Sequence, residues 1–309
     1  MPRLASPVAS PAVVLALSLL LAGCGGSSTT SVKEEPAAGS LEALRQAPGE
    51  DVAIVPGTAD FAPGRVRFSF LVVDGRGQLV TRPTARVWLA RGLDREPFLE
   101  VTATAEPIGL EGSQEEADPS EIFVTQLQIP APGKYWLLAE PVGGRKIQAI
   151  GNVVVAKRSA APNVGDRAIA SKTPTIGSTR GDLASLSTQK PPDRELLRSS
   201  VAEALAAKAP FVLTFATPQF CTTRTCGPVV DVVSAVRRRF AKTPIRFIHV
   251  EIYTDNDPAK GTNRWVAEWR LPSEPYTFLV GADGRVKDRF EGTFSVRELT
   301  AAVERELVP

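Results

Sequence analysis

The sequence of 309 residues is poor in several residue types that support common kinds of chemistry. Its one histidine, His249, excludes histidine-rich metal centres, and a Ser-His-Asp triad would have to use that residue. Lys and Arg number 36 against 34 for Asp and Glu, so the chain has neither a basic footprint for nucleic acid nor an acidic tail. No apolar run is long enough to cross a bilayer, yet 43% hydrophobic residues exclude a mostly disordered chain.

Residues 1–23 have the composition of a secretion signal. A positive charge at the start is followed by the apolar run Pro11–Leu21, about half the length of a bilayer-spanning helix. The stretch Leu21-Ala22-Gly23-Cys24 resembles a bacterial lipobox, in which the cysteine carries diacylglycerol and becomes the new N-terminus. The resemblance implies a mature chain of residues 24–309, lipid-anchored at the extracytoplasmic face of the cell membrane, where disulfides persist. The alternative is an ordinary secretion signal followed by an incidental cysteine.

Composition divides the rest of the chain into four parts. Residues 24–50 are rich in Gly, Ser, Thr and Pro and are expected to form a flexible tether. Residues 51–157 alternate apolar and polar side chains over about seven short strands, which predicts an immunoglobulin-like β-sandwich with a spacer or docking role. Within them, Pro132–Trp136 resembles the entry to a late strand of such domains. Residues 158–192 are interpreted as a linker or entry arm, and residues 193–309 as the last domain.

Helical periods and buried strands replace the simple alternation after residue 192. The apolar runs Phe211–Phe215 and Ile245–Tyr253 predict buried strands, and a helix over Val229–Phe240 between them predicts a parallel crossover. The strands Tyr276–Val280 and Arg285–Glu291 flank an Asp-Gly turn and are expected to form an antiparallel hairpin. Further helices are predicted over Asp193–Lys208, Asn263–Arg270 and Ser295–Leu307.

The two remaining cysteines, Cys221 and Cys226, lie between the first buried strand and the next helix. A strand-to-helix junction points backbone N–H groups at the side chain it holds and favours negative charge there. We therefore expect a thiol in this place to have a lowered pKa, and Arg224 adds a nearby cation. Thiol–disulfide exchange needs such an arrangement, in which one activated sulfur attacks and a second resolves the mixed disulfide.

The element order and the stretch Phe220-Cys221…Cys226-Gly227-Pro228 together resemble the thioredoxin fold over residues 193–309. The resemblance implies a C-terminal α/β domain in which Cys221 is the attacking thiol and Cys226 the resolving thiol. It also implies a cis peptide bond before Pro275, which would face the cysteines and present the backbone near Glu274 to an extended partner chain. The implied partners are extracytoplasmic protein thiols or disulfides and a membrane redox partner, and no cofactor is expected.

Two features depart from the pattern of that family. Four residues separate Cys221 from Cys226 instead of the usual two, so the loop must bulge to bring the Cα atoms within the roughly 4.4–6.8 Å of a disulfide. In addition, Thr214 stands where the family has a buried acid. Proton transfer is then left to Glu251, Asp255 or water.

Three alternatives to exchange chemistry remain open at this point. The pair Cys221 and Cys226 is also consistent with a structural disulfide that stiffens a loop. Membrane-anchored copper proteins of the Sco type bind the metal with two cysteines and one histidine, which here would be Cys221, Cys226 and His249. His249 lies in the middle of an apolar strand, a position more typical of a buried core residue. The third alternative is a non-catalytic lipoprotein whose sandwich docks a partner of the cell envelope.

Overall fold

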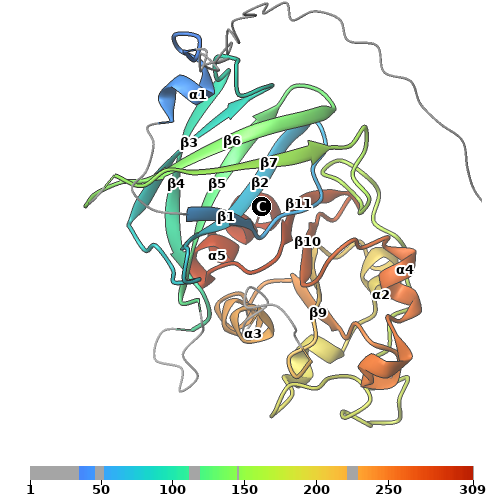
Figure 1. Cartoon of the computed structure of the whole chain (residues 1–309). Helices are drawn as coiled ribbons and strands as arrows, with labels where there is room; N and C mark the ends of the chain where they lie inside the picture. The colour runs from blue at the N-terminus through green and yellow to red at the C-terminus, as the bar shows by residue number, and fades with distance from the viewer. Residues whose placement is uncertain (1–34, 46–51, 111–118, 145, 221–228, 309) are drawn as a thin grey trace, which may run out of the picture. The chain divides into compact units, whose positions relative to one another are not determined.

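The strands of the N-terminal half close into a seven-stranded barrel, as the computed structural model shows (Figure 1). The structure describes residues 35–45, 52–110, 119–144, 146–220 and 229–308. Around the barrel the strand order is β1, β2, β5, β4, β3, β6, β7. Neighbours are antiparallel, except that β1 and β7 close the barrel through a parallel pairing of Ala53 with Ile150. The strands are β1 (Val52–Pro56), β2 (Gly64–Asp74), β3 (Thr84–Ala90), β4 (Leu99–Pro107), β5 (Glu121–Ile129), β6 (Gly133–Pro141) and β7 (Ala149–Val155).

Alternate side chains of these strands fill the barrel interior. Phe68 and Phe70 of β2 are fully buried, and their rings stack with centroids 4.9 Å apart. A short helix, α1 (Leu41–Leu44), lies outside the barrel and packs Leu41 into an apolar cluster with Trp88 and Leu138. Trp88 and Tyr135 are also buried.

The predicted immunoglobulin-like β-sandwich is wrong, because the N-terminal half forms one closed barrel. Alternation of apolar and polar residues gives each strand one apolar face, whether its sheet packs against a second sheet or curls onto itself. The choice depends on which edge strands meet. Here β1 and β7 meet at the two ends of the series, and this pairing leaves no trace in local periodicity.

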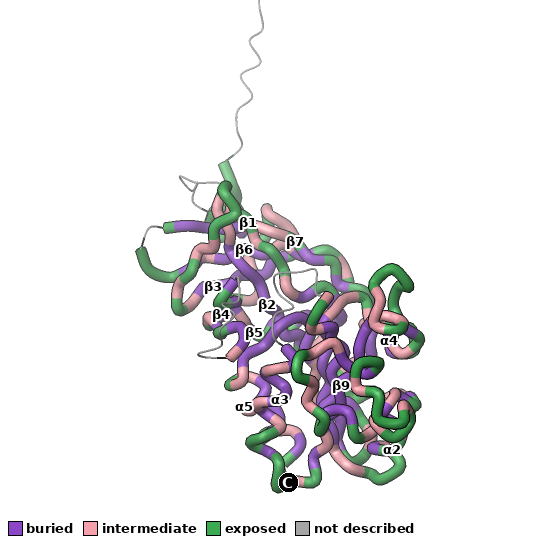
Figure 2. The backbone as a smooth tube through the Cα atoms, turned by 90° about the horizontal axis from the view of Figure 1, so that it is seen from below, coloured by how far each residue is buried: buried purple, intermediate pink, exposed green. Residues whose placement is uncertain are grey.

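A separate four-stranded sheet forms in the C-terminal half, with the order β11, β10, β8, β9. The predicted parallel crossover of β8 with β9 and the predicted antiparallel hairpin of β10 with β11 are both confirmed. Helices α3 and α5 lie on one side of the sheet, and α2 and α4 on the other (Figures 1 and 2). The elements are α2 (Val201–Ala206), β8 (Phe211–Phe215), α3 (Val229–Arg239), β9 (Arg246–Val250), α4 (Arg264–Glu268), β10 (Tyr276–Val280), β11 (Val286–Glu291) and α5 (Val296–Leu307).

The predicted α/β thioredoxin-like domain is also corrected. The described chain is mostly β, built on the closed barrel and the separate four-stranded sheet, with α1 to α5 as its α-helices. No α/β thioredoxin domain is evident in these described parts. The helix predicted over Asp193–Lys208 is instead a 3-10 turn, Arg194–Leu197, followed by the six-residue α2. Ser200 and Glu203 form a capping box there, which begins a new helix and interrupts the expected one.

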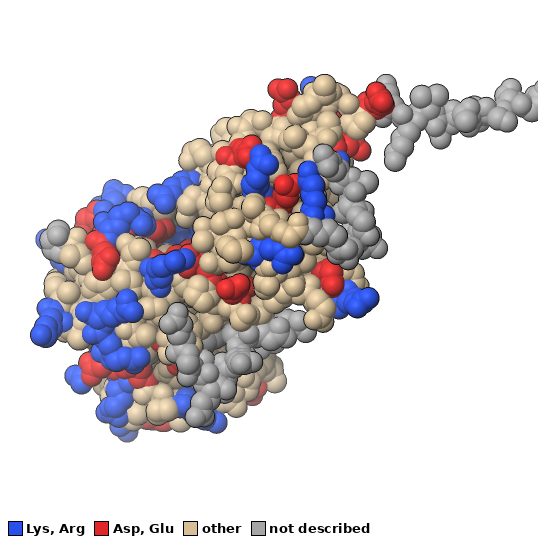
Figure 3. Space-filling view, turned by 90° about the vertical axis from the view of Figure 1, so that its left-hand side faces the viewer, with Lys and Arg blue, Asp and Glu red and all other residues tan. Residues whose placement is uncertain are grey.

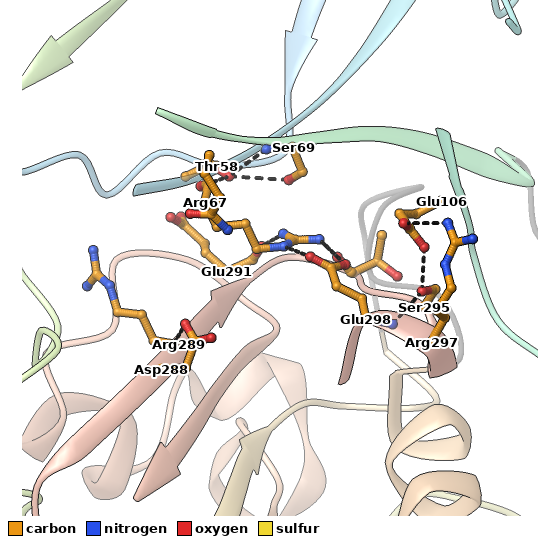
Figure 4. Close-up of polar contacts among 12 residues, drawn as sticks. Thr58, Arg67, Ser69, Glu106, Asp288, Arg289, Glu291, Ser295, Arg297 and Glu298 are labelled. Carbon is orange, nitrogen blue, oxygen red and sulfur yellow. Dashed lines mark hydrogen bonds and ion pairs between the residues drawn. The ribbon is translucent and has the colours of Figure 1, made fainter. Parts of the chain in front are cut away.

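Strand β2 is buried on both faces, and one of its outward side chains, Arg67, meets the C-terminal half (Figure 4). The guanidinium of Arg67 donates to the carboxylate of Glu298 at 2.5 and 2.9 Å. It also donates to the backbone carbonyl oxygens of Glu291 and Thr293 at 3.2 and 2.9 Å. The hydroxyl of Ser295 caps α5 by accepting a hydrogen bond from the backbone N–H of Glu298. The side chain of Glu298 binds the barrel instead of completing a capping box.

We expect Arg67→Met to lower the free energy of unfolding by about 3–5 kcal/mol, because it leaves the Glu298 carboxylate unpaired in a buried contact. Chemical denaturation of the mature chain measures this loss. The double variant Arg67→Met/Glu298→Leu should recover much of it. As a control, Arg86→Ala removes an exposed ion pair with Glu100 and should cost less than about 1 kcal/mol. Equal losses in the two single variants would contradict the assignment.

Candidate functional site

The segment that carries two of the cysteines begins after β8 and ends at α3. Outside the described residues lie the predicted site residues Cys24, Cys221, Arg224 and Cys226. The structure does describe both ends of the segment. Residues 216–220 leave β8 with Ala216 and Thr217 buried, and α3 begins with Val229 and Val230 in the core. We therefore build the candidate site from the side chains around residues 216–220.

His249, the residue considered as a copper ligand, lies on β9 opposite Thr214 of β8. Its side chain is 3% exposed, and Nε2 lies 3.0 Å from the carbonyl oxygen of Ala216. A metal bound at Nε2 would displace this hydrogen bond. In the described ranges, no three side chains of His, Cys, Asp or Glu come together as a metal site. His249 thus supports the chain that leads towards Cys221.

Glu251 is a buried carboxylate just beyond the end of β9, with only 5% of its surface exposed. Oε1 accepts hydrogen bonds from the backbone N–H and the hydroxyl of Thr188, at 2.6 and 2.8 Å. The same hydroxyl oxygen accepts a bond from the backbone N–H of Gln219 at 3.1 Å. Glu251 is therefore linked through Thr188 to a residue two positions before Cys221.

Glu251 is one of the two carboxylates considered for proton transfer. Its second oxygen, Oε2, is buried and has no hydrogen-bond partner among the described residues, and the same holds for Oγ1 of Thr217. A buried polar atom without a partner carries a desolvation cost. Asp255, the other carboxylate considered for this role, is 72% exposed and pairs with Lys260 at 3.0 Å.

Tyr253 and Glu274 form a second group of contacts, which reaches Phe220. The hydroxyl of Tyr253 donates to Oε1 of Glu274 at 3.2 Å, and its ring meets the Phe220 ring edge-on with centroids 6.5 Å apart. Burial raises the pKa of the Glu274 carboxyl, the bond from Tyr253 lowers it, and the charge of Glu251 raises it again, with a net upward shift. Burial and the neighbouring Glu274 also raise the pKa of the Tyr253 phenol.

Pro275 follows a cis peptide bond from Glu274, which confirms the isomer predicted at this position. Its carbonyl oxygen accepts a bond from the backbone N–H of Gly292 at 2.9 Å. The next residue, Tyr276, begins β10 and pairs with Phe215, the last residue of β8. Pro275 and Glu274 therefore lie at the same end of the sheet as the chain that leads to Cys221.

These contacts bring together two carboxyl groups that sequence reasoning treated separately. Glu251 was considered for proton transfer, whereas Glu274 was considered only for its backbone, and Thr188 fell inside a stretch interpreted as a linker. An acidic residue directly before the proline of a buried strand is a signal that could have singled out Glu274. Burial, and to a smaller degree the charge of Glu251, raises the pKa of the Glu274 carboxyl, so this side chain holds a proton at a higher pH than an isolated carboxyl does.

Two comparisons with known proteins were without a match. No protein-family model matches the sequence, and no curated protein matches it. The thioredoxin resemblance therefore gains no support from these comparisons. Among the helices that the structure describes, none has the length and apolar character needed to cross a membrane.

We expect Glu274→Gln to stabilise the protein at about pH 8 and to have no stabilising effect at about pH 3.5. Because the pKa of Glu274 is raised in the folded protein, its ionised form lowers the free energy of unfolding. This destabilisation is fully present above the pKa of the folded state and disappears below the pKa of the unfolded state. Thermal unfolding across this range measures the difference. Asp255→Asn is the control, because that carboxylate is exposed. A destabilisation by Glu274→Gln that is equal at both pH values would refute the electrostatic account.

Proposed function

We propose that this protein catalyses thiol–disulfide exchange through Cys221 and Cys226 outside the cytoplasmic membrane. In this proposal a lipid on Cys24 anchors the mature chain at the extracytoplasmic face, and its partners are protein thiols or disulfides and a membrane redox protein. The proposal does not depend on a thioredoxin-like fold. It depends on two sulfurs close together in the sequence, beside side chains suited to proton transfer.

The exchange reaction balances without a cofactor. The Cys221 thiolate attacks one sulfur of a partner disulfide, so a mixed disulfide forms and a partner thiolate leaves. The Cys226 thiolate then attacks the Cys221 sulfur, forming the Cys221–Cys226 disulfide and releasing the second partner thiolate. The two protons lost by the cysteines are taken up by the two partner thiolates. The reverse sequence oxidises a partner dithiol.

One observation supports the proposal more than any other. Each of the two residues directly before Cys221 contacts a side chain that is hydrogen-bonded to a carboxyl group. Gln219 binds Thr188, which binds Glu251, and the ring of Phe220 packs against Tyr253, which binds Glu274. A purely structural disulfide loop has no need of buried ionisable groups at its base, since burying a carboxylate is costly. A site for thiol–disulfide exchange does use such carboxyl groups, because they can take protons from the thiols and return them.

We expect the mature chain with Cys24→Ser to catalyse reduction of a peptide disulfide by dithiothreitol, and Cys221→Ser to abolish this catalysis. The loss follows because Cys221 supplies the thiolate that attacks the peptide disulfide in the first step. Turnover is measured by reverse-phase separation of the reduced peptide. A Cys221→Ser variant as fast as its parent would contradict exchange through this pair. Stoichiometric copper lost in His249→Ala, without turnover, would instead favour metal handling.

We expect Glu251→Gln to shift the pH profile of Cys221 alkylation downwards by about one unit, because the proposal puts the Glu251 carboxylate close enough to Cys221 for its negative charge to disfavour the thiolate. The measurement is the rate of iodoacetamide modification of the reduced chain between about pH 5 and 9. Asp255→Asn is the matched control and should leave the profile in place, since its carboxylate is exposed and paired with Lys260. Equal shifts in both variants would remove Glu251 from the mechanism.

A further inference from the structure

The barrel contributes a buried carboxylate, Asp60, to the C-terminal sheet. Asp60 lies in the connection between β1 and β2 and is 6% exposed. Its side chain accepts hydrogen bonds from the backbone N–H groups of Ala160 and Ala161 at 2.9 and 3.2 Å, and from the hydroxyl of Ser159. Arg289 of β11 donates to the same carboxylate at 2.9 Å and to the Asp60 carbonyl oxygen at 3.0 Å.

Asp60 also binds the residue that follows Pro275. The phenol of Tyr276 donates to Oδ2 of Asp60 at 3.3 Å, and both residues are buried. The contact joins the barrel to the first residue of β10, next to the cis bond at Glu274 and Pro275.

Glu291, the last residue of β11, connects the barrel to the other end of this short stretch. It is 6% exposed, and its Oε2 accepts a bond from the backbone N–H of Asp60 at 2.9 Å. Its Oε1 accepts a bond from the hydroxyl of Ser273. The carboxylate therefore bridges the barrel and a residue two positions before Pro275.

We propose that the barrel is a positioning element for the Ser273–Tyr276 stretch, which Asp60 and Glu291 hold at both ends. If the barrel were only a spacer or a docking module, its contacts with the sheet would be exposed, and their loss would leave the Ser273–Tyr276 stretch unchanged. This contact is buried, and two of its hydrogen bonds end on the residues that flank Glu274 and Pro275. Its consequence for exchange rests on the proposed function, whereas the positioning itself does not.

The contacts elsewhere in the same interface provide the contrast needed for a test. Arg67 and Glu298 join β2 to α5, and Glu106 of β4 binds Ser295 and Arg297 at 2.7 Å each (Figure 4). None of these bonds ends on the Ser273–Tyr276 stretch. A variant at Glu298 therefore weakens the attachment of the barrel and leaves the stretch itself untouched.

The test compares Asp60→Asn and Ser273→Ala with Glu298→Gln in the mature Cys24→Ser chain. Hydrogen–deuterium exchange, followed by mass spectrometry, reports on the amides of Glu274, Tyr276 and Thr277. We expect both Asp60→Asn and Ser273→Ala to speed exchange there by about tenfold relative to Glu298→Gln. Ser273→Thr keeps the hydroxyl and should restore the parental rate. Ser273→Ala keeps the test possible if Asp60→Asn does not fold.

Peptide-disulfide turnover of the same variants separates the two proposals. Faster amide exchange together with turnover lowered in Ser273→Ala and rescued in Ser273→Thr supports both the positioning role and its consequence. Faster amide exchange in a parent chain that shows no turnover supports the positioning role and refutes the proposed function. Amide exchange that is equal in Ser273→Ala and Glu298→Gln overturns the positioning role, whatever the turnover.

Discussion

The buried ion pair between Asp60 and Arg289 is the contact on which the arrangement of the candidate site depends. Their side chains are 5% and 11% exposed and lie 2.9 Å apart. Burial by itself raises the pKa of Asp60, but the hydrogen bonds from Ser159, Ala160 and Ala161 and the charge of Arg289 outweigh it, so the pKa lies below its usual value. A buried charge is tolerated when its hydrogen-bonding capacity is filled in this way.

The barrel and the C-terminal half share a polar interface, in which each of several charged side chains pairs with one of opposite charge. Arg67 with Glu298, Asp60 with Arg289, and Glu106 with Arg297 are all ion pairs across it. On the face shown in Figure 3, Lys and Arg side chains likewise lie among Asp and Glu. The same interface supports Tyr276 and Ser273 around Pro275, which connects the structural role of the barrel with the proposed exchange site.

Local features of the chain were predictable, and long-range ones were not. The apolar run Phe211–Phe215 and the Asp-Gly turn after Val280 determine structure within a few residues, so β8 and the β10–β11 hairpin follow from the sequence. Closure of the barrel, by contrast, pairs Ala53 with Ile150, and Arg67 binds a carboxylate 231 positions away. Neither partner has a local signature. The predicted sandwich failed for this reason.

The candidate site was only partly predictable for the same reason. The cysteine pair, Glu251 and Pro275 could be singled out, because each residue type carries its own chemistry. The contacts of Thr188 with Glu251 and Gln219, and the raised pKa of Glu274, depend on which segments meet at the end of the sheet.

The reduction potential of the Cys221–Cys226 pair tests the central claim most directly. It is obtained by equilibrating the mature Cys24→Ser chain with glutathione buffers and counting thiols by mass. Exchange chemistry predicts a reversible two-electron couple with a potential above about −300 mV, in the range of labile disulfides. A potential well below about −300 mV, or two thiols that never form a disulfide, would contradict it.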